Sequence, residues 1–158
     1  MWQKIKPYVI SIALALGVGT LSALLTRNGM ALYEDIVAPP LAPPAFLFPV
    51  VWTLLFVLMG VSAAIVYTDK AATPKDRESA LATYAASLLV NFTWSLIFFN
   101  LRAFLAAFLW LLLLLFLIVK TILAYRKIDP VAAYLQIPYA VWVTFAGYLT
   151  LAIWLLNR

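Results

Sequence analysis

The stretch that decides the fold is AFLAAFLWLLLLLFLIVKTILAY, Ala103 to Tyr125, in which Lys120 is the single charged residue. About 20 consecutive apolar residues are needed to cross the hydrocarbon core of a bilayer as an α-helix. A helix that is apolar on every face is buried in the core of a large protein or in a membrane. Because this chain has only 158 residues, the stretch predicts a membrane span.

Four more stretches of comparable length and character lie on either side of it. Apolar residues make up 66% of the chain and charged residues 11%, against roughly a quarter charged in soluble domains. So little charge cannot cover the surface of a water-soluble fold. We therefore predict an all-α fold, an integral membrane bundle of five transmembrane helices that forms one domain over residues 1–158. The predicted spans are 8–25, 45–67, 80–99, 103–125 and 131–156.

The ends of the spans carry further signals. Lys4 and Lys6 precede the first span, but its apolar stretch is longer than the roughly 7–15 residues of a signal-peptide core, so we expect a retained helix. Asp129 before Pro130 predicts a capped start for the last helix. The longest connection, residues 26–44, is rich in proline, which stiffens it into an extended cover. We expect it to act as a lid, with these lid residues: Tyr33, Pro43 and Pro44.

Basic residues gather on one side of the predicted bundle. Lysine and arginine cluster before span one, between spans two and three, and between spans four and five, whereas the opposite side has only Arg27, Arg102 and Arg158. Connections rich in these residues stay in the cytoplasm. We therefore expect a cytoplasmic N-terminus, an external C-terminus and a bacterial plasma membrane. Because the basic residues flank spans and do not line one face, the net charge of +5 does not indicate a nucleic-acid partner.

The chain lacks the residues of several chemistries. It has neither cysteine nor histidine, which removes thiolate nucleophiles, zinc sites, histidine bases and the usual proximal haem ligand. No Asp or Glu lies inside a predicted span, and ion-coupled transporters normally need such a group. We expect no metal and no required cofactor, and a guest held mostly by apolar and aromatic contacts.

Three predicted spans each present one face that carries a tryptophan. Residues at i, i+3, i+4 and i+7 share a face of a helix. The aligned groups on spans two, three and five are Phe48, Trp52 and Phe56; Ser87, Asn91, Trp94 and Phe98; and Pro138, Trp142, Ala146 and Leu149. One interpretation is a ligand pocket between these faces. The other is core packing, or the aromatic belt that membrane proteins carry at the headgroup level.

Other residues indicate contacts between helices. Asn91 is the one strongly polar amide that lies inside a span and far from both of its ends. It would either join two helices by a hydrogen bond, worth about 0.6–2 kcal/mol, or orient a ligand, and the sequence leaves both open. Gly19 with Ala23 has the spacing that permits close helix contact, within the chain or in a dimer.

Three motifs resemble those of the TspO/MBR family, the tryptophan-rich sensory proteins and translocator proteins, also called peripheral-type benzodiazepine receptors. The first is APPLAPPAFLFPVVWTLLFVLMG, Ala38 to Gly60. The second is LLVNFTWSLIFF, Leu88 to Phe99, and the third is IPYAVWVTFAGYL, Ile137 to Leu149. Their order and spacing extend the resemblance over nearly the whole chain.

The resemblance implies a five-helix bundle, often a homodimer, with a ligand cavity under the first loop. Family members bind protoporphyrin IX and haem, and also isoquinoline carboxamide and benzodiazepine drugs, so porphyrin or haem is the expected ligand. Some bacterial members are reported to degrade protoporphyrin in light, which would make Trp52 and Trp142 catalytic. The residues expected to bind ligand, by the resemblance or by their aligned faces, are Phe48, Trp52, Phe56, Asn91, Trp94, Phe98, Pro138, Trp142, Ala146 and Leu149.

The chain departs from the family pattern at several positions. Phe46 and Phe56 stand where the family usually has Trp and Tyr, and Trp110 stands where an acidic residue is common. The sterol-associated pattern of tyrosine followed by arginine reads Leu151 and Leu155 here. Cholesterol is therefore not an expected partner.

Three functions stay open on this basis. The leading one is a membrane receptor or sensor in which a flat macrocycle lies among aromatic side chains, with Asn91 as a polar contact. The second is an enzyme that oxidises porphyrin in light. The third is a tetrapyrrole or lipid transporter, which ranks last because the spans offer no ionisable group as an energy source. Since no histidine is present to ligate haem iron, we predict that free-base protoporphyrin binds at least as well as haem.

Overall fold

Helices account for nearly all of the regular structure in the computed structural model, which describes residues 1–158 except for the side chains of Met30 and Tyr33. The described backbone contains no strand, so the predicted all-α class is confirmed. The long helices are α1 Trp2–Thr26, α3 Leu47–Thr68, α4 Pro74–Ser95, α5 Phe104–Ile128 and α6 Pro130–Leu156. The short elements are the 3₁₀-helix η1 Arg27–Ala31, helix α2 Leu32–Asp35, and the π-helical turn η2 Leu96–Asn100, which continues α4.

The five long helices are all long and apolar enough to cross a membrane. Several extend beyond the predicted spans, because an apolar stretch marks only the part of a helix that lies in hydrocarbon. Helix α4 begins at Pro74, ahead of the predicted span, since the Thr73 hydroxyl accepts a hydrogen bond from the Asp76 amide at 3.1 Å. Helix α6 has the predicted cap, in which the Asp129 carboxylate accepts from the Val131 amide at 2.8 Å.

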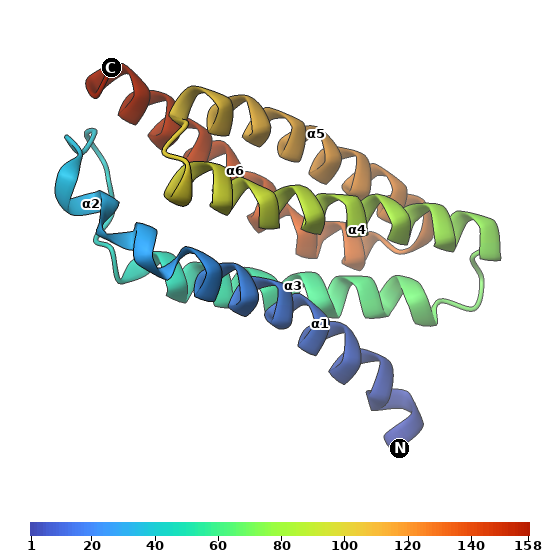
Figure 1. Ribbon diagram of the computed structural model, residues 1–158. Coiled ribbons are helices and arrows are strands. Elements are labelled where there is room, and N and C mark those ends of the chain that lie inside the picture. Colours follow the sequence, from blue (N-terminus) through green and yellow to red (C-terminus); the bar gives the residue numbers. More distant parts are fainter.

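The long helices pack side by side in the order α1, α3, α6, α5, α4, and α4 then returns to α1. Helix α1 is the least enclosed of them. In its apolar window 17% of the residues are buried, against 28% to 44% in the other four. Figure 1 shows its N-terminal half diverging from the bundle. Helix α1 is therefore the wall that can move with the least loss of packing.

Glycines let α1 and α3 approach closely where they do pack. A Cβ atom placed on Gly60 of α3 would lie 2.5 Å from the Cα of Ile12 on α1. Gly19 of α1 lies against the ring of Phe56 on α3. At these two positions the small residues serve contacts within the chain.

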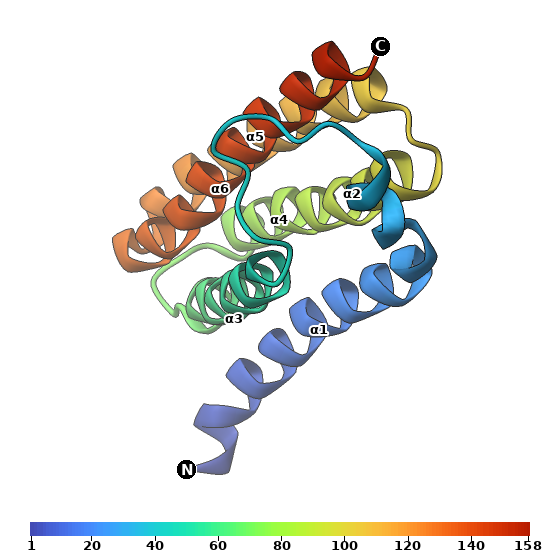
Figure 2. The ribbon, with the colours of Figure 1, turned by 90° about the vertical axis from the view of Figure 1, so that its left-hand side faces the viewer.

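The connection between α1 and α3 lies across one end of the bundle, in front of α6 in Figure 2. The prediction of an extended cover over residues 26–44 is wrong for its first part, because η1 and α2 form helical turns there. Buried Leu32 anchors these turns in the core. The backbone becomes extended only from Ile36, which has φ −105° and ψ 156°.

Polar contacts tie this connection down at both sides. Asn157, at the end of α6, accepts from the Val37 amide at 2.9 Å and donates to the Val37 carbonyl at 3.2 Å. The Tyr148 hydroxyl donates to the Pro40 carbonyl at 2.8 Å. Arg102, between η2 and α5, pairs with Asp35 at 3.2 Å. The cover is thus a strap fixed to the bundle.

Candidate functional site

A cavity of about 270 Å³ lies between α1, α3, α4 and α6, towards the end of the bundle that the strap crosses. Leu16 and a set of small or hydroxyl-bearing residues form its α1 wall: Gly19, Thr20, Ser22, Ala23 and Thr26. Aromatic residues dominate the other walls: Phe48, Trp52, Phe56, Trp94, Phe99 and Trp142. None of the described residues that line it is charged. The cavity is therefore suited to a flat, largely apolar guest.

The indole rings on its wall are held by neighbouring aromatic side chains. The Trp52 ring lies 5.7 Å from the ring of Phe56, and Tyr139 meets it edge-on at 6.2 Å. Phe48 meets Trp142 edge-on at 5.9 Å. Such pairs contribute about 0.5–1.5 kcal/mol each beyond the burial of area, so the rings are fixed before any ligand arrives.

Asn91 joins α4 to α6 beside the cavity. Its side-chain amide donates to the Tyr139 hydroxyl at 2.9 Å, and both residues are buried. The interhelical bond that the sequence left as one alternative is therefore present. Because Asn91 also lines the cavity, a role in orienting a guest remains compatible with this bond.

Tyr139 is a site residue that the sequence reasoning missed. Most buried residues of α6 recur with a heptad spacing, namely Ala132, Gln136, Tyr139, Val143, Ala146, Thr150 and Ile153, and Ala133, Gly147 and Leu149 widen this seam. Of the predicted face, Trp142 and Ala146 reach the cavity, whereas Pro138 is exposed. The signal was available in the pattern, because the polar Gln136, Tyr139 and Thr150 fall on one stripe.

The structure brings most of the predicted ligand residues to this single cavity, namely Phe48, Trp52, Phe56, Asn91, Trp94, Trp142 and Ala146. It does not bring Phe98, Pro138 or Leu149 to the cavity wall. Pro138 is exposed and Leu149 is buried away from the cavity.

Phe98 lies behind Trp94 because of the π-helical turn. The Leu101 amide donates to the Leu96 carbonyl at 3.1 Å, five residues back, and this spacing adds one residue to the turn. Phe99 therefore takes the place on the wall that an unbroken α-helix would give to Phe98. Phe98 stacks on Trp94 instead, with ring centroids 5.2 Å apart.

The predicted lid residues do not form part of the wall. Pro43 is half-buried and Pro44 is exposed, and neither lines the cavity. The side chain of Tyr33 lies outside the described residues. The sequence did not lead us to predict the α1 residues that form one wall of the cavity. The small-residue spacing of Gly19 and Ala23 nevertheless marked that face of the helix.

Two indole N–H groups at the site are buried without an acceptor. Those of Trp94 and Trp142 have no hydrogen-bond partner among the described residues. By contrast, the Trp110 indole donates to the Thr93 hydroxyl at 2.8 Å and to the Val90 carbonyl at 3.0 Å, which joins α5 to α4. The indole nitrogens of Trp94 and Trp142 are fully buried, so a guest with acceptor atoms would reach these two donors only once the cavity widened.

Sequence comparison agrees with this architecture. The model of the TspO/MBR family matches residues 11–155. The chain is 34% identical to the tryptophan-rich protein TspO of Chlorobaculum tepidum, over 99% of each chain. It is 35% identical to protein CrtK of Rhodobacter capsulatus, over 80% of this chain and 79% of that one. It is 31% identical to the translocator protein of Bos taurus, over 89% and 83% of the two chains. The chain is an integral membrane protein that belongs to the TspO/MBR family.

Proposed function

We propose that the protein is a membrane receptor whose cavity binds a tetrapyrrole, with free-base protoporphyrin bound at least as well as haem. The observation that carries this proposal is the convergence of Trp52, Trp94 and Trp142, from three helices, on one uncharged cavity. Flat aromatic rings pack well against indoles. The binding of porphyrins expected from the family resemblance fits this wall.

The polar groups of the site suit the same guest. The unpaired indole N–H groups of Trp94 and Trp142 are donors, and a macrocycle with carboxylate substituents supplies acceptors. Asn91 adds a polar contact on the α4 side. No histidine is present to ligate haem iron. Haem would therefore form no iron–histidine bond with the protein, and this bond would give it no advantage over free-base protoporphyrin.

The size of the cavity sets a condition on binding. Ligand pockets usually measure roughly 300–1,000 Å³, and this cavity measures about 270 Å³. A substituted macrocycle is too large for it, so the cavity has to widen. Helix α1 is the wall to move, because it is the least buried span. Charged substituents of the guest would point to the end of α1, where Arg27 follows the lining residue Thr26.

Titration of the purified protein with protoporphyrin tests the proposal. We expect Trp52→Phe and Trp142→Phe each to weaken binding about two- to tenfold, which corresponds to the 0.5–1.5 kcal/mol of an aromatic pair. The readout is the Soret absorbance of the porphyrin, since tryptophan fluorescence changes with the substitutions themselves. Trp154→Phe is the control, because Trp154 lies outside the cavity beneath the Arg158 guanidinium. Unchanged affinity in both cavity variants would overturn the proposal.

A light-driven oxidation of porphyrin is the second candidate function. It is favoured by the position of Trp52 and Trp142 on the wall of the same cavity, where both indoles would contact one bound macrocycle. Illumination of the complex in air should then yield a new bilin-like absorbance that is lost in a Trp52→Phe, Trp142→Phe double variant. Bleaching at the same rate in that variant would exclude the reaction.

The setting of the protein in the cell is part of the proposal. The excess of lysine and arginine at the end of the bundle that holds the N-terminus favours a cytoplasmic N-terminus in a bacterial plasma membrane. The strap and the aromatic cavity would then lie on the external side. A homodimer is the assembly expected from the family resemblance.

A further inference from the structure

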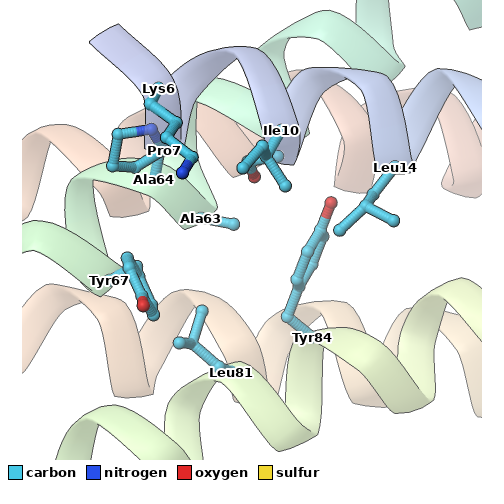
Figure 3. Close-up of a pocket in the computed structure, with 10 residues that line it drawn as sticks. Lys6, Pro7, Ile10, Leu14, Ala63, Ala64, Tyr67, Leu81 and Tyr84 are labelled. Carbon is cyan, nitrogen blue, oxygen red and sulfur yellow. The ribbon is translucent and has the colours of Figure 1, made fainter. Parts of the chain in front are cut away.

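A second cavity, of about 540 Å³, lies near the other end of α1. Figure 3 shows α1 on one side of it and α3 and α4 on the other. Its lining residues are Lys6, Pro7, Ile10, Ser11, Leu14, Ala63, Ala64, Tyr67, Leu81 and Tyr84. Ile10, Leu14 and Tyr67 are also exposed. The cavity is therefore a groove open to its surroundings, which beside a membrane-spanning helix are lipid.

The hydroxyl of Tyr84 is the unusual polar group of this groove. Tyr84 is only 7% exposed, and its hydroxyl has no hydrogen-bond partner among the described residues. Figure 3 shows the phenol projecting from α4 towards α1, with its oxygen between Ile10 and Leu14. Leaving a buried donor unpaired is costly, so the groove favours a guest that carries an acceptor oxygen.

The mouth of the groove is positively charged. Lys6 lines it, Lys4 lies nearby on α1, and no described lining residue is acidic. The ion pair found among the described residues joins Arg102 and Asp35, which lie at the opposite end of the bundle. Lys6 is therefore free to pair with an anionic guest. Ile10 and Leu14, which flank the Tyr84 hydroxyl, lie about 6 and 12 Å from Lys6 along the helix axis.

We propose that this groove is a binding site for an acidic glycerophospholipid. From the mouth inwards the groove offers the cation of Lys6, then the apolar residues Ala63, Ala64 and Leu81, and then the hydroxyl of Tyr84 beside Leu14. In such a lipid a phosphate is followed by the glycerol carbons, an ester carbonyl and an acyl chain. Lys6 pairs with the phosphate, the glycerol lies over Ala63 and Ala64, Tyr84 donates to an ester carbonyl, and the chain continues along Leu14. None of these residues lines the aromatic cavity, so the two sites share helix α1 but no lining residue.

Native mass spectrometry of the detergent-purified full chain tests this site. The probes are phosphatidylglycerol, phosphatidylcholine with the same chains, and an ether-linked phosphatidylglycerol that lacks the ester carbonyls. We expect the wild-type protein to retain phosphatidylglycerol severalfold better than either of the other two. Lys6→Gln should abolish the preference for the acidic head group. Tyr84→Phe should abolish the preference for the ester. Ser11→Phe, which fills the groove from α1, should reduce retention of all three lipids.

Matched controls separate the site from general effects. Lys4→Gln removes a neighbouring charge outside the groove, and Tyr125→Phe removes a buried, unpartnered hydroxyl that does not line it. Both should retain lipid as the wild type does, and Trp52→Phe should do so as well. Equal retention of the two head groups by the wild type would overturn the proposal. So would a loss in Lys4→Gln equal to that in Lys6→Gln, or unchanged retention in Ser11→Phe. Thermal unfolding of each variant identifies any that fails to fold.

Discussion

The hydrogen bond between Asn91 and Tyr139 sets the geometry of the aromatic cavity at the scale of single residues. In a bilayer a buried amide has no water to bond with, so its partner on another helix fixes the rotation of both helices. Tyr139 also places its ring edge-on against Trp52. One phenol therefore connects the polar residue of α4 with the indole of α3.

We predict that Tyr139→Phe destabilises the protein by about 0.6–2 kcal/mol, because the Asn91 amide loses its acceptor. Unfolding of the purified protein in mixed detergent micelles measures this. Tyr134→Phe is the control, since Tyr134 is exposed on the same helix. In a double variant with Asn91→Ala the two losses should not add, because both remove the same bond. Additive losses would show that the two side chains act separately.

At the scale of elements, the sequence predicted the position of the helices but not every detail of their rotation. Apolar length alone located the five spans, because a helix has to cover the thickness of the bilayer. Rotation about the helix axis was predicted well for α3, where Phe48, Trp52 and Phe56 all reach the cavity. On α6 the predicted face was right for Trp142 and Ala146 but not for Pro138, because apolar residues occupy both the lipid-facing and the buried sides. Hydrophobic periodicity then carries little information, and only the polar stripe at Gln136, Tyr139 and Thr150 marks the inside.

The π-helical turn of α4 is an element that no apolar pattern reveals. It exchanges Phe98 for Phe99 on the cavity wall by adding one residue to the turn. The helical start of the strap was hidden in a similar way, because the prolines that suggested extended backbone lie only in its second half. Both features depend on contacts between elements, which a sequence pattern along one helix does not record.

The contact between α1 and α3 yields a prediction at the scale of elements. Gly60→Ala should be destabilising by about 1–3 kcal/mol, because the new Cβ would meet the backbone of Ile12 and push α1 outwards. Gly17→Ala is the matched variant, since nothing lies within 4 Å of its added Cβ. It should be neutral or slightly stabilising, as alanine favours the helix over glycine. Equal thermal unfolding midpoints for the two variants would contradict the close packing of α1.

At the scale of the whole molecule, α1 links two sites of different character. Its C-terminal half closes the aromatic cavity, and its N-terminal half borders the lipid groove. Any outward movement of α1 that admits a large guest would also change the groove. The orientation of the chain decides which leaflet the groove faces. With the proposed cytoplasmic N-terminus, the groove would open to the cytoplasmic leaflet.

This orientation can be measured with single-cysteine variants, because the chain has no cysteine of its own. Ala38 lies exposed in the strap, and Ala71 lies exposed between α3 and α4, at the opposite end of the bundle. In intact bacterial cells a membrane-impermeant maleimide should label Ala38→Cys at once and Ala71→Cys only after permeabilisation. The physical reason is the basic character of the α3–α4 connection, which contains Lys70, and of the first turn of α4, which contains Lys75 and Arg77; these residues hold this end in the cytoplasm. The reverse labelling would overturn the proposed orientation and would place the lipid groove in the outer leaflet.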